Sequence, residues 1–358
     1  MENRELDFYR GRRVFVTGHT GFKGAWLCRL LIGAGAQVTG YALPAPTVPD
    51  LYSLAGLEGW MTSVTGDVRD LGRLKAAFDA AEPEIVLHLA AQPIVRAAYE
   101  DPVGTYATNV MGTVNLLECV RRAEKPPRSV VIVTTDKVYE NREWVWGYRE
   151  NERLDGFDPY SNSKSCAELA AASYRRCFFQ NGGSAVSTAR AGNVIGGGDF
   201  ARDRILPDCV RAAQAGRPVI LRNPGSVRPY QHVLEPLLAY LMIARRQYEE
   251  PSLADCYNVG PDDCDCVTTG ALAELFCQSW GGGMTWEDRS EPGGPHEAGF
   301  LKLDCGKLKS VFGWQPRWRI REAVERTVEW TRAWLAGASV PQVMDEQIRA
   351  FLRSGGQN

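Results

Sequence analysis

Short apolar runs recur along the chain and alternate with longer segments in which apolar residues return every three or four positions. The first run, RVFVT at 13–17, is followed by a segment at 21–34 whose apolar residues fall on one helical face. Further strand-like runs lie at 36–42, 85–89, 130–134, 185–189 and 255–259. This alternation is typical of a parallel sheet with helices on both faces. The pattern therefore predicts an α/β fold, a doubly wound parallel sheet of the Rossmann type.

Two stretches interrupt the alternation. The stretch at 193–245 is rich in Gly, Arg and Pro, and the one at 260–318 contains GGGM and PGGP. Because a strand falls between them, we expect a first domain at 1–192 with a strand that returns near 255–260. A smaller C-terminal domain would then be built from insertions at 193–254 and 261–358, after the strand ends where open α/β sheets bind ligands. Amphipathic helices are expected around 321–335 and at the C-terminus.

Composition and charge exclude some classes of partner. The chain has 358 residues, enough for about two domains, and 41 Lys and Arg against 43 Asp and Glu leave a net charge of −2. No global field draws it to nucleic acid or to an anionic membrane, so we expect neither as a partner. The opening residues, MENRELDFYRGRR, are charged, and no apolar run reaches the roughly 18–20 residues of a bilayer span. A cytoplasmic location is therefore expected.

The ten cysteines do not indicate disulfides or a metal. Several lie in predicted helices of a large chain, where buried, reduced thiols are the ordinary state. The group Cys256, Cys264 and Cys266 lacks paired CxxC spacing and a nearby His. We expect no metal site.

A glycine motif follows the first strand. The sequence TGHTGFKG places Gly18, Gly21 and Gly24 where the backbone can approach a pyrophosphate at a helix N-terminus, which predicts a dinucleotide cofactor. Neither an acid nor an arginine occurs at 40–46, near the expected ribose contact, and the absence of a partner for a 2′-phosphate favours NAD over NADP. Asp67, after a further strand-like run, either bonds the adenine amine or caps a turn.

A phenol and an amine stand four residues apart in DPYSNSK. Tyr160 and Lys164 fall on one face of a helix that begins at Asp158 or Pro159. A phenol with a reference pKa of ~10 is a poor base at neutral pH, but a nearby cation, reinforced by an oxidised nicotinamide, favours the phenolate. The pair can then remove a sugar hydroxyl proton during hydride transfer, and Thr135 at a strand end can complete a hydroxyl relay.

In this combination the chain resembles the extended short-chain dehydrogenase/reductase superfamily over nearly its whole length. The shared segments are TGHTGFKG, HLAAQ, TNVMGTVNLLE, TTDKVYEN, YSNSK, RAGNVIGGGD and FGWQP, in order. Within the superfamily, AAQPIVR, TTDKVYEN, RPYQHVLEP and PHEAGFLKLD resemble segments of CDP-glucose 4,6-dehydratases. The resemblance implies tightly held NAD, a homodimer built on a helix bundle, and conversion of CDP-glucose to CDP-4-keto-6-deoxyglucose. It also implies a role in deoxysugar and O-antigen biosynthesis.

The resemblance assigns residues to the cofactor and the sugar nucleotide. Asn193 and Arg228 match positions that contact the substrate diphosphate, and Arg204 is either a third contact or a helix-entry residue. His88 and His232 are expected to be packing residues, and His296 is expected to be a packing or hydrogen-bonding residue or a substrate contact. The implied cofactor site contains Gly18, His19, Gly21, Phe22, Lys23, Gly24, Asp67, Val68, Leu89, Ala90, Ala91, Gln92, Asn109, Tyr160 and Lys164.

By the same resemblance, the end of the strand at 130–134 carries an added acid–base set. Thr135 bonds the C4 oxygen, Asp136 protonates the departing C6 hydroxyl, and Lys137 removes the C5 proton or stabilises the enolate. Many related dehydratases carry Glu at the position of Lys137. An ammonium must have its pKa lowered to act as a base, and it should also depress the pKa of Asp136, which has to hold a proton. A proton shared by the pair, or a purely enolate-stabilising role for Lys137, would each resolve this conflict.

Three alternatives remain at this level. A dehydratase acting on another nucleotide sugar shares most of these motifs. A C4 epimerase or simple reductase would not need the acid at Asp136. A catalytically silent NAD(H)-sensing protein could dispense with both Tyr160 and Lys164, so their joint presence favours an enzyme.

Overall fold

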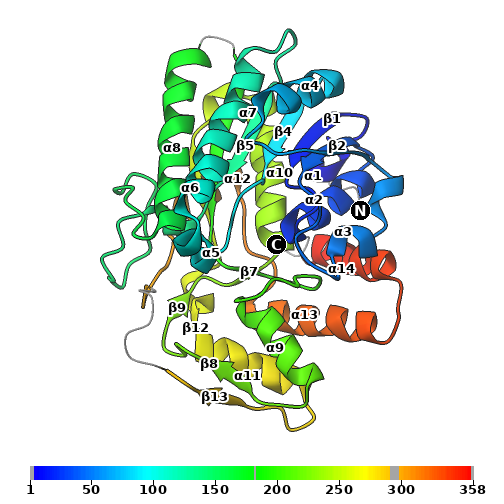
Figure 1. The fold of residues 1–358 in the computed structure, drawn as a ribbon, viewed down its shortest axis with the longest axis vertical. Coiled ribbons are helices and arrows are strands. Elements are labelled where there is room, and N and C mark those ends of the chain that lie inside the picture. Colours follow the sequence, from blue (N-terminus) through cyan, green and yellow to red (C-terminus); the bar gives the residue numbers. More distant parts are fainter. Residues whose placement is uncertain (1–3, 181–182, 291–297, 356–358) are drawn as a thin grey trace.

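The computed structural model describes residues 4–180, 183–290 and 298–355, and its central element is a seven-stranded parallel sheet (Figure 1). The strand order β11-β6-β5-β4-β1-β2-β3 is that of a doubly wound sheet, so the predicted Rossmann-type fold is confirmed. The strands are β1 (Arg13–Thr17), β2 (Gln37–Ala42), β3 (Thr62–Thr65), β4 (Ile85–His88), β5 (Ser129–Val133), β6 (Ala185–Ala191) and β11 (Cys256–Val259).

Periodicity located the buried strands better than the edge strand. The six strand-like runs whose bounds were predicted match six of these strands to within two residues at each end. The run before Asp67 is β3, at the edge of the sheet, and three of its four residues are exposed. An edge strand with little buried surface carries no apolar pattern from which its bounds could be predicted.

Successive side chains of the central strands point to opposite faces of the sheet, and each face is covered by its own helices. In β1, Val14 and Val16 belong to the cluster beneath α2 (Phe22–Gly33) and α10 (Leu234–Glu249). Phe15, between them, belongs to the opposite cluster, which contains residues of α4 (Leu71–Ala81), α7 (Gly112–Arg121) and α8 (Pro159–Phe178). This arrangement explains why the strands read as continuous apolar runs.

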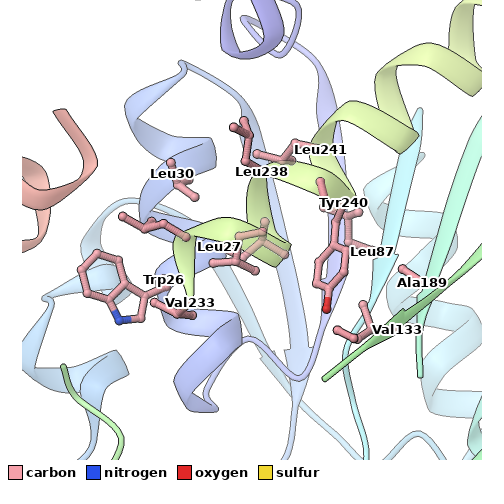
Figure 2. Packing of buried hydrophobic residues seen from close by; sticks show 14 of the residues in the cluster. Trp26, Leu27, Leu30, Leu87, Val133, Ala189, Val233, Leu238, Tyr240 and Leu241 are labelled. Atoms are coloured by element: carbon pink, nitrogen blue, oxygen red, sulfur yellow. The ribbon is translucent and has the colours of Figure 1, made fainter. Parts of the chain in front are cut away.

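Figure 2 shows the packing on the face covered by α2 and α10. Trp26 of α2 lies beside Val233, the residue before α10, while Leu27 lies between the two helices and Val133 of β5 lies close to the Tyr240 ring. Helix α10 is buried on nearly every side, which is why its sequence, LEPLLAYLMIARRQYE, is apolar almost all round. The helix lies inside the segment 193–254, which the sequence assigned to the second domain, yet here it covers the sheet.

A third hydrophobic cluster lies apart from the sheet, in the lower part of Figure 1. It contains residues of α9 (Ile205–Gln214), α11 (Thr269–Trp280) and α13 (Ile320–Leu335), with β8 (Val219–Leu221) paired in parallel to β13 (Trp286–Asp288). Helix α13 matches the amphipathic helix expected around 321–335. We propose that this cluster is the core of the smaller domain, and we place α10, α12 (Gly306–Phe312) and α14 (Val340–Ser354) with the sheet because their buried residues join its cluster.

Short elements complete the fold. Two-residue strands pair as β7 (Val194–Ile195) with β10 (Gln231–His232) and as β9 (Val227–Arg228) with β12 (Val267–Thr268).

Within the described residues, no helix is long and apolar enough to cross a membrane, and no group of His, Cys, Asp or Glu could hold a metal ion. The remaining helical segments are α1 (Arg4–Asp7), α3 (Leu51–Leu54), α5 (Val95–Glu100), α6 (Pro102–Tyr106), a π-helical turn at Ala107–Met111, and 3-10 turns at Leu57–Gly59, Asp136–Val138, Pro251–Leu253 and Asp263–Asp265.

Candidate active site

Two adjoining cavities lie at the carboxyl ends of the sheet strands. The larger, of about 1000 Å³, is lined by the segments that follow β1, β2, β3 and β4. The smaller, of about 310 Å³, is lined by the segments that follow β5 and β6 together with residues of the proposed smaller domain. They share six lining residues, namely Lys23, Pro93, Ile94, Asp199, Asp203 and Arg204. A ligand in one cavity therefore meets a ligand in the other at this shared wall.

The glycine turn after β1 forms one wall of the larger cavity. Gly18 has a φ of +77°, and a Cβ on it would lie 2.7 Å from the backbone nitrogen of Ala90. A Cβ on Gly24 would lie 2.1 Å from the carbonyl oxygen of Gly18, so this turn excludes side chains at both positions. Helix α2 begins directly after Gly21, and no side chain caps it. Its first amides are thus available to an anion, as binding of a dinucleotide pyrophosphate requires.

Ten of the residues assigned to the cofactor line this cavity: Gly18, Gly21, Phe22, Lys23, Gly24, Asp67, Val68, Leu89, Ala90 and Ala91. A cavity of this volume with a bare glycine turn at one wall fits a dinucleotide. Arg202 also lines it and comes from the loop at 198–204, far in sequence from the end of β2 where a ribose partner was sought.

Asp67 behaves mainly as a turn residue. Its carboxylate accepts a hydrogen bond from the Arg69 amide at 2.9 Å and forms an ion pair with the Arg69 guanidinium at 2.5 Å, which holds the pKa of Asp67 below its usual value. The carboxylate therefore already has a partner, although the residue remains on the cavity wall.

Three other residues assigned to the cofactor, His19, Gln92 and Asn109, do not line the larger cavity. The His19 ring lies beneath Gly40 of β2 and bonds Ser63 at 2.7 Å, and burial lowers its pKa to about 4. Asn109 accepts a hydrogen bond from the Gln92 amide and donates to Ser163 at 2.9 Å. The contacts of Asn109 tie the loop after β4 to α8. The side chains of His19, Gln92 and Asn109 thus support the cavity walls from behind.

The strand end that carries the expected acid is buried. Thr135 caps the short turn Asp136–Val138, and its hydroxyl donates to Oδ1 of Asp136 at 2.9 Å. Oδ2 of Asp136 is buried and has no hydrogen-bond partner among the described residues. Burial raises the pKa of Asp136, and this effect outweighs the opposing charges of Lys137 and Arg228. The conflict expected between Lys137 and Asp136 is thus decided by desolvation, which favours the protonated acid.

Tyr160 and Lys164 lie on one face of α8, whose start is fixed by Asp158, since its carboxylate accepts hydrogen bonds from the amides of Tyr160 and Ser161. The Lys164 ammonium donates to the Val133 carbonyl at 3.2 Å, and burial lowers its pKa to about 8. Burial also raises the pKa of Tyr160 to about 12. This direction is opposite to the one expected from the Tyr–Lys spacing, because desolvation of the phenolate outweighs the nearby groups.

The substrate residues assigned from sequence occupy the smaller cavity where they can be seen. Asn193, Arg204 and Arg228 line it, as does Lys137, which was assigned to catalysis. The buried Arg228 guanidinium donates to the carbonyls of Val227 and Ala298, which fixes its direction. His296 lies outside the described residues. Tyr160, Thr135 and Asp136 line the same cavity, whereas Lys164 is not among its lining residues.

Several lining residues were missed by sequence reasoning. Asp203 lines both cavities and has a backbone φ of +58°, and its carboxylate pairs with Arg96 of α5 at 3.3 Å and with Arg222 at 3.1 Å. Asp199, in the same loop, pairs with Arg204 at 3.3 Å. The GNVIGGGD segment hinted at a loop here, but only the three-dimensional fold brings it across both cavities. Ser226 and Thr269, joined at 2.8 Å, add hydroxyls to the smaller cavity.

The histidines expected to be packing residues are buried outside both cavities. His88 bonds Thr17 at 2.7 Å and Thr113 at 3.3 Å, and burial lowers its pKa to about 3. His232 packs edge-on against Trp26 and Trp318.

Comparison with known proteins gives relatives of similar length. A profile of the family described as GDP-mannose 4,6 dehydratase matches residues 15–327. A CDP-glucose 4,6-dehydratase of Salmonella typhimurium is 50% identical over 354 residues, which cover 97% of this chain and 98% of that protein. A dTDP-glucose 4,6-dehydratase of Streptomyces antibioticus is 30% identical over 334 residues, or 90% of this chain and 93% of that one.

Solved structures show the same fold. The UDP-glucose 4-epimerase of Thermus thermophilus, in complex with NAD, superposes with a TM-score of 0.77 at 26% identity and covers 89% of this chain and 99% of that one. The dTDP-glucose 4,6-dehydratase DesIV of Streptomyces venezuelae, with NAD and TYD bound, has a TM-score of 0.77 at 23% identity and covers 91% and 98%. The resemblance inferred from the motifs is therefore confirmed, and the chain belongs to the GDP-mannose 4,6 dehydratase family.

Proposed function

We propose that the protein is a hydro-lyase that converts CDP-glucose to CDP-4-keto-6-deoxyglucose and water with NAD as its cofactor. The observation that carries this proposal is the buried carboxyl of Asp136, whose raised pKa favours a held proton, in the same cavity as Tyr160. An oxidation site with a proton donor beside it has what elimination of water from a newly formed ketone requires. The 50% identity with the Salmonella enzyme supports CDP-glucose as the substrate.

In this proposal the larger cavity holds NAD. The first amides of α2 and the bare glycine turn would receive the pyrophosphate, and the wall shared with the smaller cavity would bring the nicotinamide to the sugar. NAD bound there would supply the hydride acceptor and donor that the C4 and C6 chemistry requires. Related structures with NAD bound support this cofactor.

The side chains of the smaller cavity divide the acid–base work. Tyr160 removes the C4 hydroxyl proton. The positive charge of Lys164, on the same helical face, favours the phenolate form of Tyr160. Thr135 bonds the C4 oxygen. The new ketone acidifies the C5 proton, and Asp136 protonates the C6 hydroxyl, which departs as water. Arg228 and Arg204 would hold the diphosphate, for which an arginine fork is well suited.

Lys137 keeps two possible roles in this proposal. Its ammonium lines the cavity beside Asp136, where it either accepts the C5 proton after losing its own or stabilises the enolate oxygen as a cation. The homodimer, the cytoplasmic location and the place in deoxysugar and O-antigen biosynthesis also belong to the proposal and rest on the sequence resemblance.

A C4 epimerase is the second candidate, because the epimerase of Thermus thermophilus shares the fold at 26% identity. An epimerase has no use for a proton donor at C6, which favours the dehydratase. The test is to incubate the purified protein with NAD or NADP and a panel of CDP-, dTDP-, GDP- and UDP-hexoses. We expect a 4-keto-6-deoxy product and loss of water from CDP-glucose with NAD. A product of unchanged mass, epimerised at C4, would support the epimerase instead.

A further inference from the structure

One turnover of the proposed reaction, on which this inference rests, leaves two side chains in changed protonation states. Tyr160 gains the proton of the C4 hydroxyl, while Asp136 loses its proton to the hydroxyl that departs from C6. The proton taken from C5 is replaced by a proton delivered to C5 when the hydride reaches C6, so the group that handles these protons is reset within the turnover. At the end, one proton must move from Tyr160 to Asp136 before the next substrate can react.

The structure has one hydroxyl between these two groups. The Thr135 hydroxyl donates to Oδ1 of Asp136 at 2.9 Å, and Thr135 and Tyr160 line the same cavity, where a side-chain hydrogen bond with Thr135 acts to lower the pKa of Tyr160. The amide of Lys137 also donates to Oγ1 of Thr135 at 3.4 Å. A hydroxyl offers one donor and two acceptor positions, so Thr135 can donate to Asp136 while its oxygen accepts from another group. The contacts hold Thr135 with its hydrogen toward Asp136 and its oxygen open to the phenol.

The carboxyl of Asp136 is poorly connected to anything else. Its side chain is 2% exposed, and Oδ2 lies under Gly192, where an added Cβ would be 3.3 Å away. Among the described residues, Thr135 is the only side chain that forms a hydrogen bond with Asp136, and no histidine of the described chain lines the cavity. Direct exchange of the Asp136 proton with bulk water is therefore hindered when substrate fills the cavity.

We propose that Thr135 is a proton relay that resets the site after each turnover. The Tyr160 O–H bond breaks as its proton passes to Oγ1 of Thr135, and the Thr135 O–H bond breaks as its own proton passes to Oδ1 of Asp136. Two O–H bonds break, two form, and Thr135 ends neutral. A half-turn of the Asp136 carboxyl about its broad χ2 torsion then exchanges its two oxygens.

Burial raises the pKa of Tyr160 and so opposes release of its proton, and two other effects favour the transfer to Asp136. The positive charge on the nicotinamide, restored once the hydride has reached C6, favours the Tyr160 phenolate. Burial favours the protonated form of Asp136. The water that leaves in one turnover then carries the proton taken from the C4 hydroxyl two turnovers before it.

Thr135→Val tests the relay because valine has nearly the same shape and lacks the hydroxyl, while Thr135→Ser keeps the hydroxyl as a matched control. Product would be measured per active site by rapid quench with saturating CDP-glucose and NAD. In Thr135→Val we expect one product per site to form in a first phase, followed by turnover at least about tenfold slower. Small acids and bases such as formate and imidazole, added at constant pH, should accelerate only the second phase. Thr135→Ser should show no such slow phase.

The outcomes separate the relay from other roles of Thr135. If Thr135 only bonds the C4 oxygen, the first and later turnovers of Thr135→Val will be slowed equally, and the relay is overturned. A slow phase that does not respond to added buffers indicates product release and overturns it as well. Circular dichroism and NAD affinity identify a misfolded variant, in which case Thr135→Ala replaces it. If the unaltered protein forms no 4-keto product, the proposed function itself fails, which is a separate result.

Discussion

Arg190 and Glu168 form an ion pair of 2.8 Å between Nη2 and Oε2, with side chains only 4% and 2% exposed. Glu168 also accepts hydrogen bonds from Thr134 and Thr188, and Arg190 donates to Tyr139. The pair thus lies directly behind the strand end that carries Thr135 and Asp136. Lys164 and Glu168 are one helical turn apart, so the face of α8 that presents Tyr160 continues into this network.

Glu168→Gln should destabilise the protein strongly, because it leaves the Arg190 guanidinium buried without a countercharge. Removal of one partner from such a pair lowers the free energy of unfolding by about 3–5 kcal/mol. Urea unfolding followed by circular dichroism measures the change. Glu82→Gln, at the exposed pair with Lys125, is the matched control and should leave the unfolding midpoint nearly unchanged. Equal effects of the two variants would show that the buried pair has no special weight.

Tyr160→Phe should abolish most of the oxidation step, since it removes the group that takes the C4 hydroxyl proton. Loss of a positioned acid–base group lowers the rate by about 10²–10⁴-fold. NAD affinity should be retained, because the turn that would bind the pyrophosphate is in another cavity wall. The measurement is formation of NADH absorbance on mixing with CDP-glucose, and turnover close to that of the parent would refute the assignment.

Asp136→Asn should separate oxidation from elimination. The amide keeps the shape of the side chain but cannot deliver a proton to the C6 hydroxyl, so the variant should form NADH on meeting CDP-glucose and then stall. Because burial raises the pKa of Asp136, elimination by the parent should require its protonated form and fall as pH rises through that pKa. Single-turnover absorbance across pH checks both statements. Release of product at the parental rate would place the acid elsewhere.

Lys137→Ala distinguishes the two roles of that residue. If Lys137 removes the C5 proton, the variant should stop exchange of the C5 hydrogen with deuterated water, which Asp136→Asn should still allow. Mass analysis of recovered sugar nucleotide gives the deuterium content. Continued exchange in Lys137→Ala would assign the residue to enolate stabilisation.

A separate labelling experiment tests the return of the hydride. In the parent protein, substrate deuterated at C4 should give product deuterated at C6.

The stability of the protein should fall with rising pH because of Glu235. Its Oε1 accepts hydrogen bonds from the amides of Arg317 and Trp318, and burial raises its pKa from 4.5 to about 7. The folded state therefore holds the proton more tightly than the unfolded state, so this stability is fully present below pH ~4.5 and is lost as pH rises through 7. Glu235→Gln should be more stable than the parent by about 1–3 kcal/mol at pH 8 and similar to it at pH 5. Urea unfolding at both values tests this, and parallel pH profiles would contradict it.

The sequence predicted those parts of the molecule that local patterns determine. Continuous apolar runs located the central strands, and the glycine spacing located a turn whose φ and close contacts admit no side chain at Gly18 or Gly24. The face shared by Tyr160 and Lys164 follows from helical periodicity alone. The family followed from long motifs, each of which is a local feature.

Long-range packing determined what the sequence could not predict. The burial of Asp136, which raises its pKa, involves the contact of its Oδ2 with Gly192, and the opposing charge of Arg228 also comes from a distant segment. The motif alone gave no indication that the His19 ring turns beneath Gly40 and away from the cavity. Helix α10 covers the sheet although it lies within an insertion, because its side chains are apolar on nearly every side.

The loop at 198–204 supplies Asp199, Asp203 and Arg204 to both cavities, and Phe200 anchors it against Trp330 and Trp334. Efforts to change the preferred sugar nucleotide by altering this loop will therefore also change how firmly the enzyme retains its redox partner. Ser226 and Thr269 line the smaller cavity alone. Substitutions at these two positions can therefore alter the substrate cavity without altering the lining of the cofactor cavity. They are the more suitable positions for changing substrate preference.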